Sequence, residues 1–139
     1  MDRTERRLTM EFSELIKQAE KVLGHRELSG SAEAGSVAAA ILGANGKVYV
    51  GVCIDTACSL GFCAEHSAAA AMVTDGESRI LKVAAVGEGG AVMPPCGRCR
   101  EFLTQLHPEN REALALVAPD TAVTLGELLP FDWKAGRNK

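Results

Sequence analysis

The chain has 139 residues, the usual size of one domain, so we expect residues 1–139 to fold as a single domain. Apolar residues make up 47% and charged residues 24%, which excludes a disordered or low-complexity chain. The formal net charge is −3 and no long Lys/Arg run occurs, so a nucleic-acid partner is disfavoured and a small-molecule substrate is favoured.

The N-terminus is charged, and no run of about 18 apolar residues occurs. We therefore expect a cytoplasmic protein without a membrane partner. The five cysteines are an odd number, which favours free thiols or metal ligands over a disulfide framework.

The first part of the chain predicts one helix and a β-hairpin. Apolar residues recur at helical spacing over residues 8–23, and Gly24 follows as a stop signal. Two apolar runs, residues 37–42 and 48–54, flank Asn45-Gly46. An Asn-Gly pair in this setting is a strong hairpin signal, so we expect two antiparallel strands.

The remaining elements alternate between helices and strands. Residues 63–73 are rich in alanine and predict a helix, and residues 80–86 predict a buried strand. A second helix is expected from Cys96 until the His107-Pro108 pair, and residues 113–118 predict another strand.

A capping-box pattern then begins a short closing helix at Thr124, with Glu127 three residues later and Pro130 at its end. The order of the elements predicts an α/β fold, in which helices cover both faces of one mixed sheet.

Three of the cysteines lie at predicted helix starts. Cys96 and Cys99 are three residues apart, so both side chains fall on nearly the same face of a helix. A helix N-terminus favours anions, so we expect both thiols, and Cys63 at the other helix start, to ionise easily. If the two N-termini meet, the three thiolates would bind one Zn²⁺.

Glu65 decides between a structural and a catalytic interpretation of these thiols. Three protein ligands leave the fourth position of a tetrahedral zinc open, as in catalytic sites. A carboxylate two residues after Cys63 can lie beside that position and transfer protons. The alternatives are a redox pair, or a structural zinc closed by a fourth sulfur from Cys53 or Cys58.

Three thiolates concentrate negative charge, so a nearby cation is expected to balance it. Arg98 and His66 are the candidates for this role.

Cys63-Ala64-Glu65 followed by Pro95-Cys96-x-x-Cys99 resembles the signature of the zinc-dependent cytidine deaminase superfamily. Within it, residues 34–133 look most similar to the blasticidin-S deaminases. That similarity rests on Ser36-Val37-Ala38, residues 45–52, Pro95 to Arg100, Leu106-His107-Pro108 and Glu127 to Pro130.

The resemblance implies a three-layer α/β/α cytidine-deaminase-like fold with a mixed sheet of about five strands. It implies one Zn²⁺ per chain, bound by Cys63, Cys96 and Cys99, with Glu65 as the proton carrier. The implied reaction is hydrolytic deamination of a cytosine-like nucleoside or analogue, in a homotetramer or a dimer. The backbone around Ala64 and Pro95 would bind the edge of the base.

The chain departs from the family pattern where the sugar binds. Cytidine deaminases commonly use an Asn-x-Glu pattern to hold the ribose hydroxyls, and this chain has Cys53-Ile54-Asp55. We therefore assign Cys53 and Asp55 to substrate binding. Cytidine, blasticidin S and another aminated heterocycle stay open as substrates, with a slight preference against plain cytidine, and a non-catalytic zinc module is the rival from another class.

Overall fold

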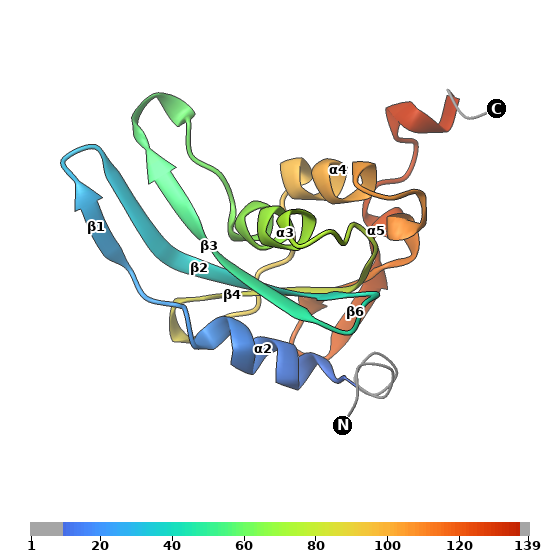
Figure 1. Cartoon of the computed structure of the whole chain (residues 1–139), viewed down its shortest axis with the longest axis horizontal. Helices are drawn as coiled ribbons and strands as arrows, with labels where there is room; N and C mark the ends of the chain where they lie inside the picture. Colours follow the sequence, from blue (N-terminus) through green and yellow to red (C-terminus); the bar gives the residue numbers. More distant parts are fainter. Residues whose placement is uncertain (1–9, 137–139) are drawn as a thin grey trace.

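The structure of the protein is a computed structural model that describes residues 10–136. Within them a six-stranded mixed sheet carries helices on both faces (Figure 1). The strands are β1 (Arg26–Ser29), β2 (Ala32–Gly43), β3 (Val48–Thr56), β4 (Ile80–Gly87), β5 (Leu114–Ala118) and β6 (Thr121–Thr124). The helices are α2 (Phe12–Glu20), α3 (Ala64–Thr74), α4 (Gly97–Gln105) and α5 (Leu125–Leu128), with short 3-10 turns at 57–59, 88–90, 108–112 and 133–136.

Strand β2 is the centre of the sheet. It pairs with β3 along one edge, and β1 and β4 share its other edge; all three pairings are antiparallel. Strand β5 then pairs in parallel with β4, and β6 pairs antiparallel with β5. The predicted mixed sheet is thereby confirmed.

Two strands were not predicted from the sequence, β1 and β6. Each has only four residues, and all four residues of β1 are exposed, so no apolar alternation marks it. Strand β6 runs directly into the cap of α5. Both strands form by hydrogen bonding to the edge of a longer strand, β1 to β2 and β6 to β5. Such pairing depends on the folded chain and not on the local sequence.

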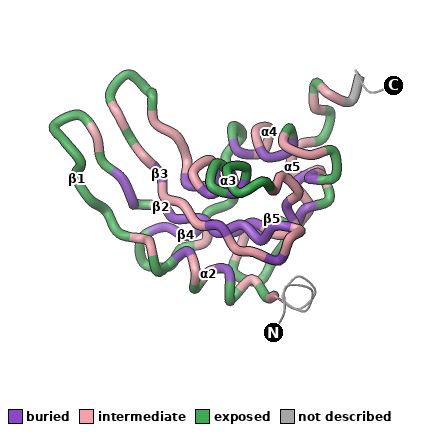
Figure 2. The backbone as a smooth tube through the Cα atoms, viewed as in Figure 1, coloured by how far each residue is buried: buried purple, intermediate pink, exposed green. Residues whose placement is uncertain are grey.

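The side chains of β2 alternate between two separate cores. Ala39 and Ile41 belong to the core beneath α3 and α4, whereas Ala38, Ala40 and Leu42 belong to the core beneath α2. All five are fully buried, as Figure 2 shows for the central strand. Burial on both faces explains why this strand reads as a continuous apolar run rather than an alternating one.

Local sequence signals for the turns and caps are confirmed. Gly46 has a φ of 81°, and the Asn45 side chain accepts a hydrogen bond from the backbone N–H of Lys47. The capping box of α5 is complete, because Thr124 and Glu127 each accept from the other's backbone N–H.

The first helix begins at Phe12 in the structure, and Leu8, where we expected it to begin, lies outside the described residues. No helix within residues 10–136 is long and apolar enough to cross a membrane.

Helix α3 packs against β3 with almost no space between them. A Cβ atom on Gly51 would lie 2.4 Å from the backbone nitrogen of Ala68 and 2.4 Å from the Cβ of Ser67. The Ser67 hydroxyl also donates to the carbonyl oxygen of Val52 at 2.7 Å. Glycine at position 51 therefore allows the contact that fixes where α3 begins.

Candidate metal centre and adjoining cavity

Two helices begin at cysteines, and their N-termini meet. Cys63 is the N-cap of α3 and Cys96 is the N-cap of α4, each with extended backbone geometry. Their carbonyl oxygens accept the first helical hydrogen bonds, from Ser67 and Arg100 respectively. Neither side chain forms a cap hydrogen bond with its own helix, so both sulfurs remain available to a ligand.

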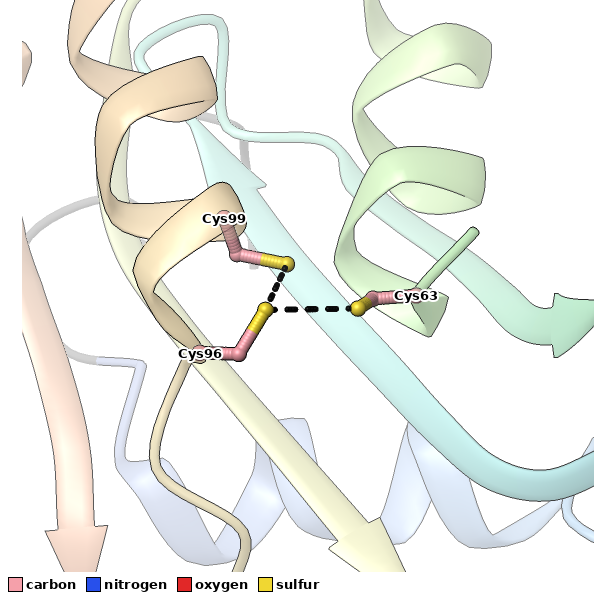
Figure 3. A group of neighbouring side chains, drawn as sticks. All are labelled: Cys63, Cys96 and Cys99. Carbon is pink, nitrogen blue, oxygen red and sulfur yellow. Dashed lines mark hydrogen bonds between the residues drawn. The ribbon is translucent and has the colours of Figure 1, made fainter. Parts of the chain in front are cut away.

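The three predicted thiols converge. The Sγ atoms of Cys63 and Cys96 are 3.4 Å apart, and those of Cys96 and Cys99 are 3.6 Å apart. All three sulfurs lie within 4.8 Å of one another (Figure 3). Sulfur ligands about 2.3 Å from a tetrahedral zinc lie about 3.8 Å from each other. The cluster therefore fits one zinc ion with three thiolate ligands.

The other two cysteines lie apart from this cluster. Cys58 is exposed in the turn after β3, and its φ is 63°. Cys53 is buried in β3, where its sulfur accepts from the backbone N–H of Val37 at 3.3 Å. Neither supplies the fourth sulfur that a closed structural zinc site would need.

The expectation that all three thiols ionise easily is wrong for two of them. The pKa of Cys96 is lowered, because hydrogen bonds from the backbone of Cys99 and Arg98 and from the other thiols outweigh its desolvation. Burial raises the pKa of Cys63 and, strongly, that of Cys99; the Glu65 carboxylate acts in the same direction on both. Burial and crowding of like charges exceed the effect of the helix dipole here.

Glu65 lies in the first turn of α3, beside these thiols. The residue is 5% exposed, and this burial raises the pKa of its carboxyl group. Hydrogen bonds from its own backbone N–H and from the Cys99 thiol act in the opposite direction. A carboxyl group whose pKa is moved toward neutrality is suited to accept and return a proton.

A cavity of about 360 Å³ opens beside the thiols and Glu65. Its volume falls in the lower part of the range typical of small-ligand sites. Its walls come from β2, β3, the starts of α3 and α4, and the loops before those helices. They are formed by Ser36, Val37, Cys53, Asp55, Gly61, Phe62, Cys63, Ala64, Glu65, Met93, Pro94, Cys96 and Arg98.

The two residues assigned to substrate binding from β3 both line this cavity. The Asp55 carboxylate is exposed, and the Cys53 thiol donates to it over 3.8 Å. The hydroxyl of Ser36, from β2, lies 3.4 Å from the same sulfur. Asp55 is thus placed to accept a hydrogen bond from a group in the cavity.

Around the helix starts, Ala64 lines the cavity as the first residue of α3, where backbone N–H groups have no partner within the helix. Pro95 is buried, and its carbonyl oxygen accepts from Nε of Arg100 at 2.8 Å; the neighbouring Pro94 lines the cavity. Arg98 lines the cavity rim and donates to the carbonyl oxygen of Gly61 at 3.0 Å.

His66, the other candidate for charge balance, is half-buried behind the thiols. Its Nδ1 lies 3.5 Å from the sulfur of Cys99. Desolvation and the positive charge of Arg98 lower the pKa of its imidazole. Of the two candidates, His66 has the direct contact with a thiol.

Sequence reasoning did not find several residues of the cavity wall. Phe62 and Met93 line it, and Phe62 pairs with Ile54 through an isolated β-bridge. Of these two residues, only Phe62 could have been found from the sequence. It directly precedes the N-cap Cys63, and an apolar residue at that position often packs against the first turn of the helix.

Comparison with known proteins places this site in a family. Residues 11–113 match the family model described as the cytidine and deoxycytidylate deaminase zinc-binding region. The chain belongs to this family. It is 34% identical to a cytidine deaminase of Mycobacterium tuberculosis over 68% of this chain and 70% of that protein. A cytidine deaminase of Halalkalibacterium halodurans is 32% identical over 68% of this chain and 74% of its own length.

Solved structures agree with the sequence comparison. The crystal structure of cytidine deaminase from Mycobacterium tuberculosis superposes with a TM-score of 0.75 at 30% identity, covering 90% of this chain and 98% of that one. The deaminase fold is therefore shown, and the three thiols supply the donor set for the zinc of a zinc-binding family.

We predict that zinc binding releases protons at neutral pH. The raised pKa values of Cys63 and Cys99 keep these thiols protonated in the metal-free protein, and both must lose their protons to bind zinc. At least about two protons per zinc, from Cys63 and Cys99, should appear in weakly buffered solution with a pH indicator, and the apparent zinc affinity should fall as the pH falls.

The matched control is Cys58→Ser, which removes a thiol outside the cluster and should leave the proton count unchanged. Zinc binding without proton release would contradict the prediction.

Proposed function

We propose that this protein is a zinc-dependent hydrolytic deaminase, which replaces the exocyclic amine of a cytosine-like ring with oxygen and releases ammonia. The observation that carries the proposal is the buried Glu65 carboxylate beside three convergent thiols, at the wall of one cavity. The family to which the chain belongs and its cytidine deaminase relatives support the same reaction.

Each group would have a defined task. Cys63, Cys96 and Cys99 would bind the zinc, which acts as a Lewis acid that activates water. Glu65 would accept one proton from the attacking water and deliver it to the ring nitrogen, and would then take the second proton of that water from the added hydroxyl and deliver it to the departing amine. The backbone N–H of Ala64, at the start of α3, would orient the base.

A non-catalytic zinc module is the rival function. It requires a fourth protein ligand, and the positions of Cys53 and Cys58 do not supply one from sulfur. The location that we propose is the cytoplasm. The three cysteines must stay reduced to bind zinc, and the cytoplasm keeps thiols reduced.

Glu65→Gln separates the two functions. We expect this change to lower the deamination rate by roughly 10²- to 10⁴-fold, because the amide cannot carry the proton. Zinc content, measured by atomic absorption, and the circular dichroism spectrum should be unchanged. Glu88→Gln, an exposed change after β4, is the control and should keep full activity. Equal activity of the Glu65 variant and the parent protein would refute the mechanism.

The substrate is proposed to carry a hydrogen-bond donor beyond the base. The Asp55 carboxylate can only accept hydrogen bonds when ionised, and it lies exposed at the cavity wall. A sugar hydroxyl or an amine would satisfy it. Cytidine and blasticidin-S-type analogues both carry such groups, and Cys53 in place of an amide donor favours a substrate other than plain cytidine.

Asp55→Ala tests this assignment. We expect kcat/KM for a nucleoside to fall by about 10- to 100-fold, the usual loss for a hydrogen bond to a charged group. The rate with the free base should change little, because the free base has no group at that position. Ammonia release across cytidine, deoxycytidine, cytosine and blasticidin S measures both effects.

Asp120→Ala removes a carboxylate from the exposed turn between β5 and β6, and it should leave every rate unchanged. An equal loss with nucleoside and free base would show that Asp55 does not bind the substituent.

We also propose that the active form is a homo-oligomer, with a tetramer favoured. Leu60 is 76% exposed directly beside Gly61 and Phe62, which line the cavity, and Leu28 on β1 is 56% exposed. A neighbouring subunit would cover such apolar side chains.

Light scattering after size exclusion should therefore give a mass four times that of the chain. Leu60→Asp should lower both the mass and the activity, whereas a fully active monomer would contradict a cavity completed by its neighbours.

A further inference from the structure

His66 contacts a zinc ligand from outside the ligand set. It follows Glu65 in α3, and its Nδ1 lies 3.5 Å from Sγ of Cys99. Cys99 is fully buried, so no water competes for this side of the sulfur. The imidazole nitrogen is as near to this sulfur as the sulfur of Cys96, which lies at 3.6 Å.

The ring of His66 is held in place by aromatic neighbours. It stacks on Phe102, from α4, with centroids 4.1 Å apart and an interplanar angle of 13°. The ring of Phe62 is a second neighbour, with its centroid 6.4 Å from that of His66 and a tilt of 35°. Phe62 lines the substrate cavity, so one aromatic row joins the cavity wall to the metal ligand. Stacking of this kind limits ring rotation and keeps Nδ1 directed at the sulfur.

The direction of the hydrogen bond follows from the chemistry of the ligand. A thiolate bound to a metal has no proton and can only accept, so the imidazole must donate. The nitrogen that faces the sulfur is Nδ1. We propose that His66 is a positioning residue, which donates its Nδ1–H to the Cys99 thiolate and thereby fixes this ligand in the zinc-loaded protein.

This inference rests on the proposed metal site and not on the identity of the substrate. It makes His66 an outer partner of the metal, of the kind that orients a ligand and tunes its electron density. The donor is a side chain of α3 acting on a ligand of α4, so it also ties the two helix starts together.

Nitrogen NMR of the zinc-loaded protein tests the tautomer without any substrate. The chain has three histidines, and His107 provides an internal contrast. Its Nδ1 accepts from the backbone N–H of Glu109 at 3.0 Å, so neutral His107 must carry its proton on Nε2. We expect His66 to show a proton on Nδ1. A bare Nδ1 with a proton only on Nε2 would overturn the proposal.

Two substitutions separate the hydrogen bond from the packing of the ring. His66→Asn keeps an N–H donor near the place of Nδ1, and His66→Phe keeps an aromatic ring without a donor. In competition with a chelator, the Phe variant should bind zinc about 10- to 100-fold more weakly, the usual effect of losing an outer partner. The Asn variant should retain most of the affinity.

Equal losses in both variants, or no loss in the Phe variant, would overturn the proposal. If the Phe variant does not fold, as judged by circular dichroism, the NMR measurement of the His66 tautomer in the parent protein tests the proposal by itself. Failure of the parent protein to deaminate any compound of the panel would refute the proposed function and leave the zinc-affinity and NMR results of His66 standing.

Discussion

The contact between α3 and the sheet is the constraint on which the site depends. At Gly51 the strand approaches the helix so closely that no side chain fits between them. This contact fixes the start of α3, and with it the N-cap Cys63 and the first-turn Glu65. A shift of α3 by one residue would turn both side chains by about 100° and carry them away from Cys96 and Cys99 of α4.

The second constraint is electrostatic, and it opposes the assembly of the site. Three thiols and a carboxylate are collected at one place, where Cys99 and Glu65 are buried and Cys63 is partly buried, so the metal-free protein keeps Cys63 and Cys99 protonated. A divalent cation reverses this preference, because it neutralises the charges that burial makes costly. The same burial that disfavours the thiolates raises the pKa of Glu65, and a proton carrier benefits from that shift.

The sequence predicted the metal centre better than the substrate region, for a physical reason. Helix starts have local signals, so Cys63 and Cys96 could be placed at N-caps, and a spacing of three residues brought Cys99 to the same side. The cavity wall depends on pairing between distant segments. Phe62 forms a bridge with Ile54, and its place before the N-cap Cys63 indicates packing against α3 but does not indicate this bridge.

The same distinction explains the errors. The helix dipole is a local effect and predicted three ionised thiols, whereas burial and mutual repulsion, which only the folded chain reveals, keep two of them protonated. The short strands β1 and β6 likewise form on the edges of longer neighbours. The sequence was sufficient to predict features whose hydrogen bonds join residues within one turn of the chain, such as the capping box of α5 and the turn at Asn45.

His66, which follows Glu65, lies where a different side chain would alter the charge at the site without changing its three thiols. An arginine at this position would bring the full positive charge of a guanidinium to the thiolates. His66 brings a ring that is neutral through desolvation and the charge of Arg98, and Phe102 stacks against it. A neutral donor at this position would orient Cys99 while cancelling less of its charge than a guanidinium would, so more negative charge would remain on the sulfur ligands. Greater charge on the ligands would weaken a bound zinc as a Lewis acid, and the proposed proton transfer by Glu65 would then have to contribute more to the reaction.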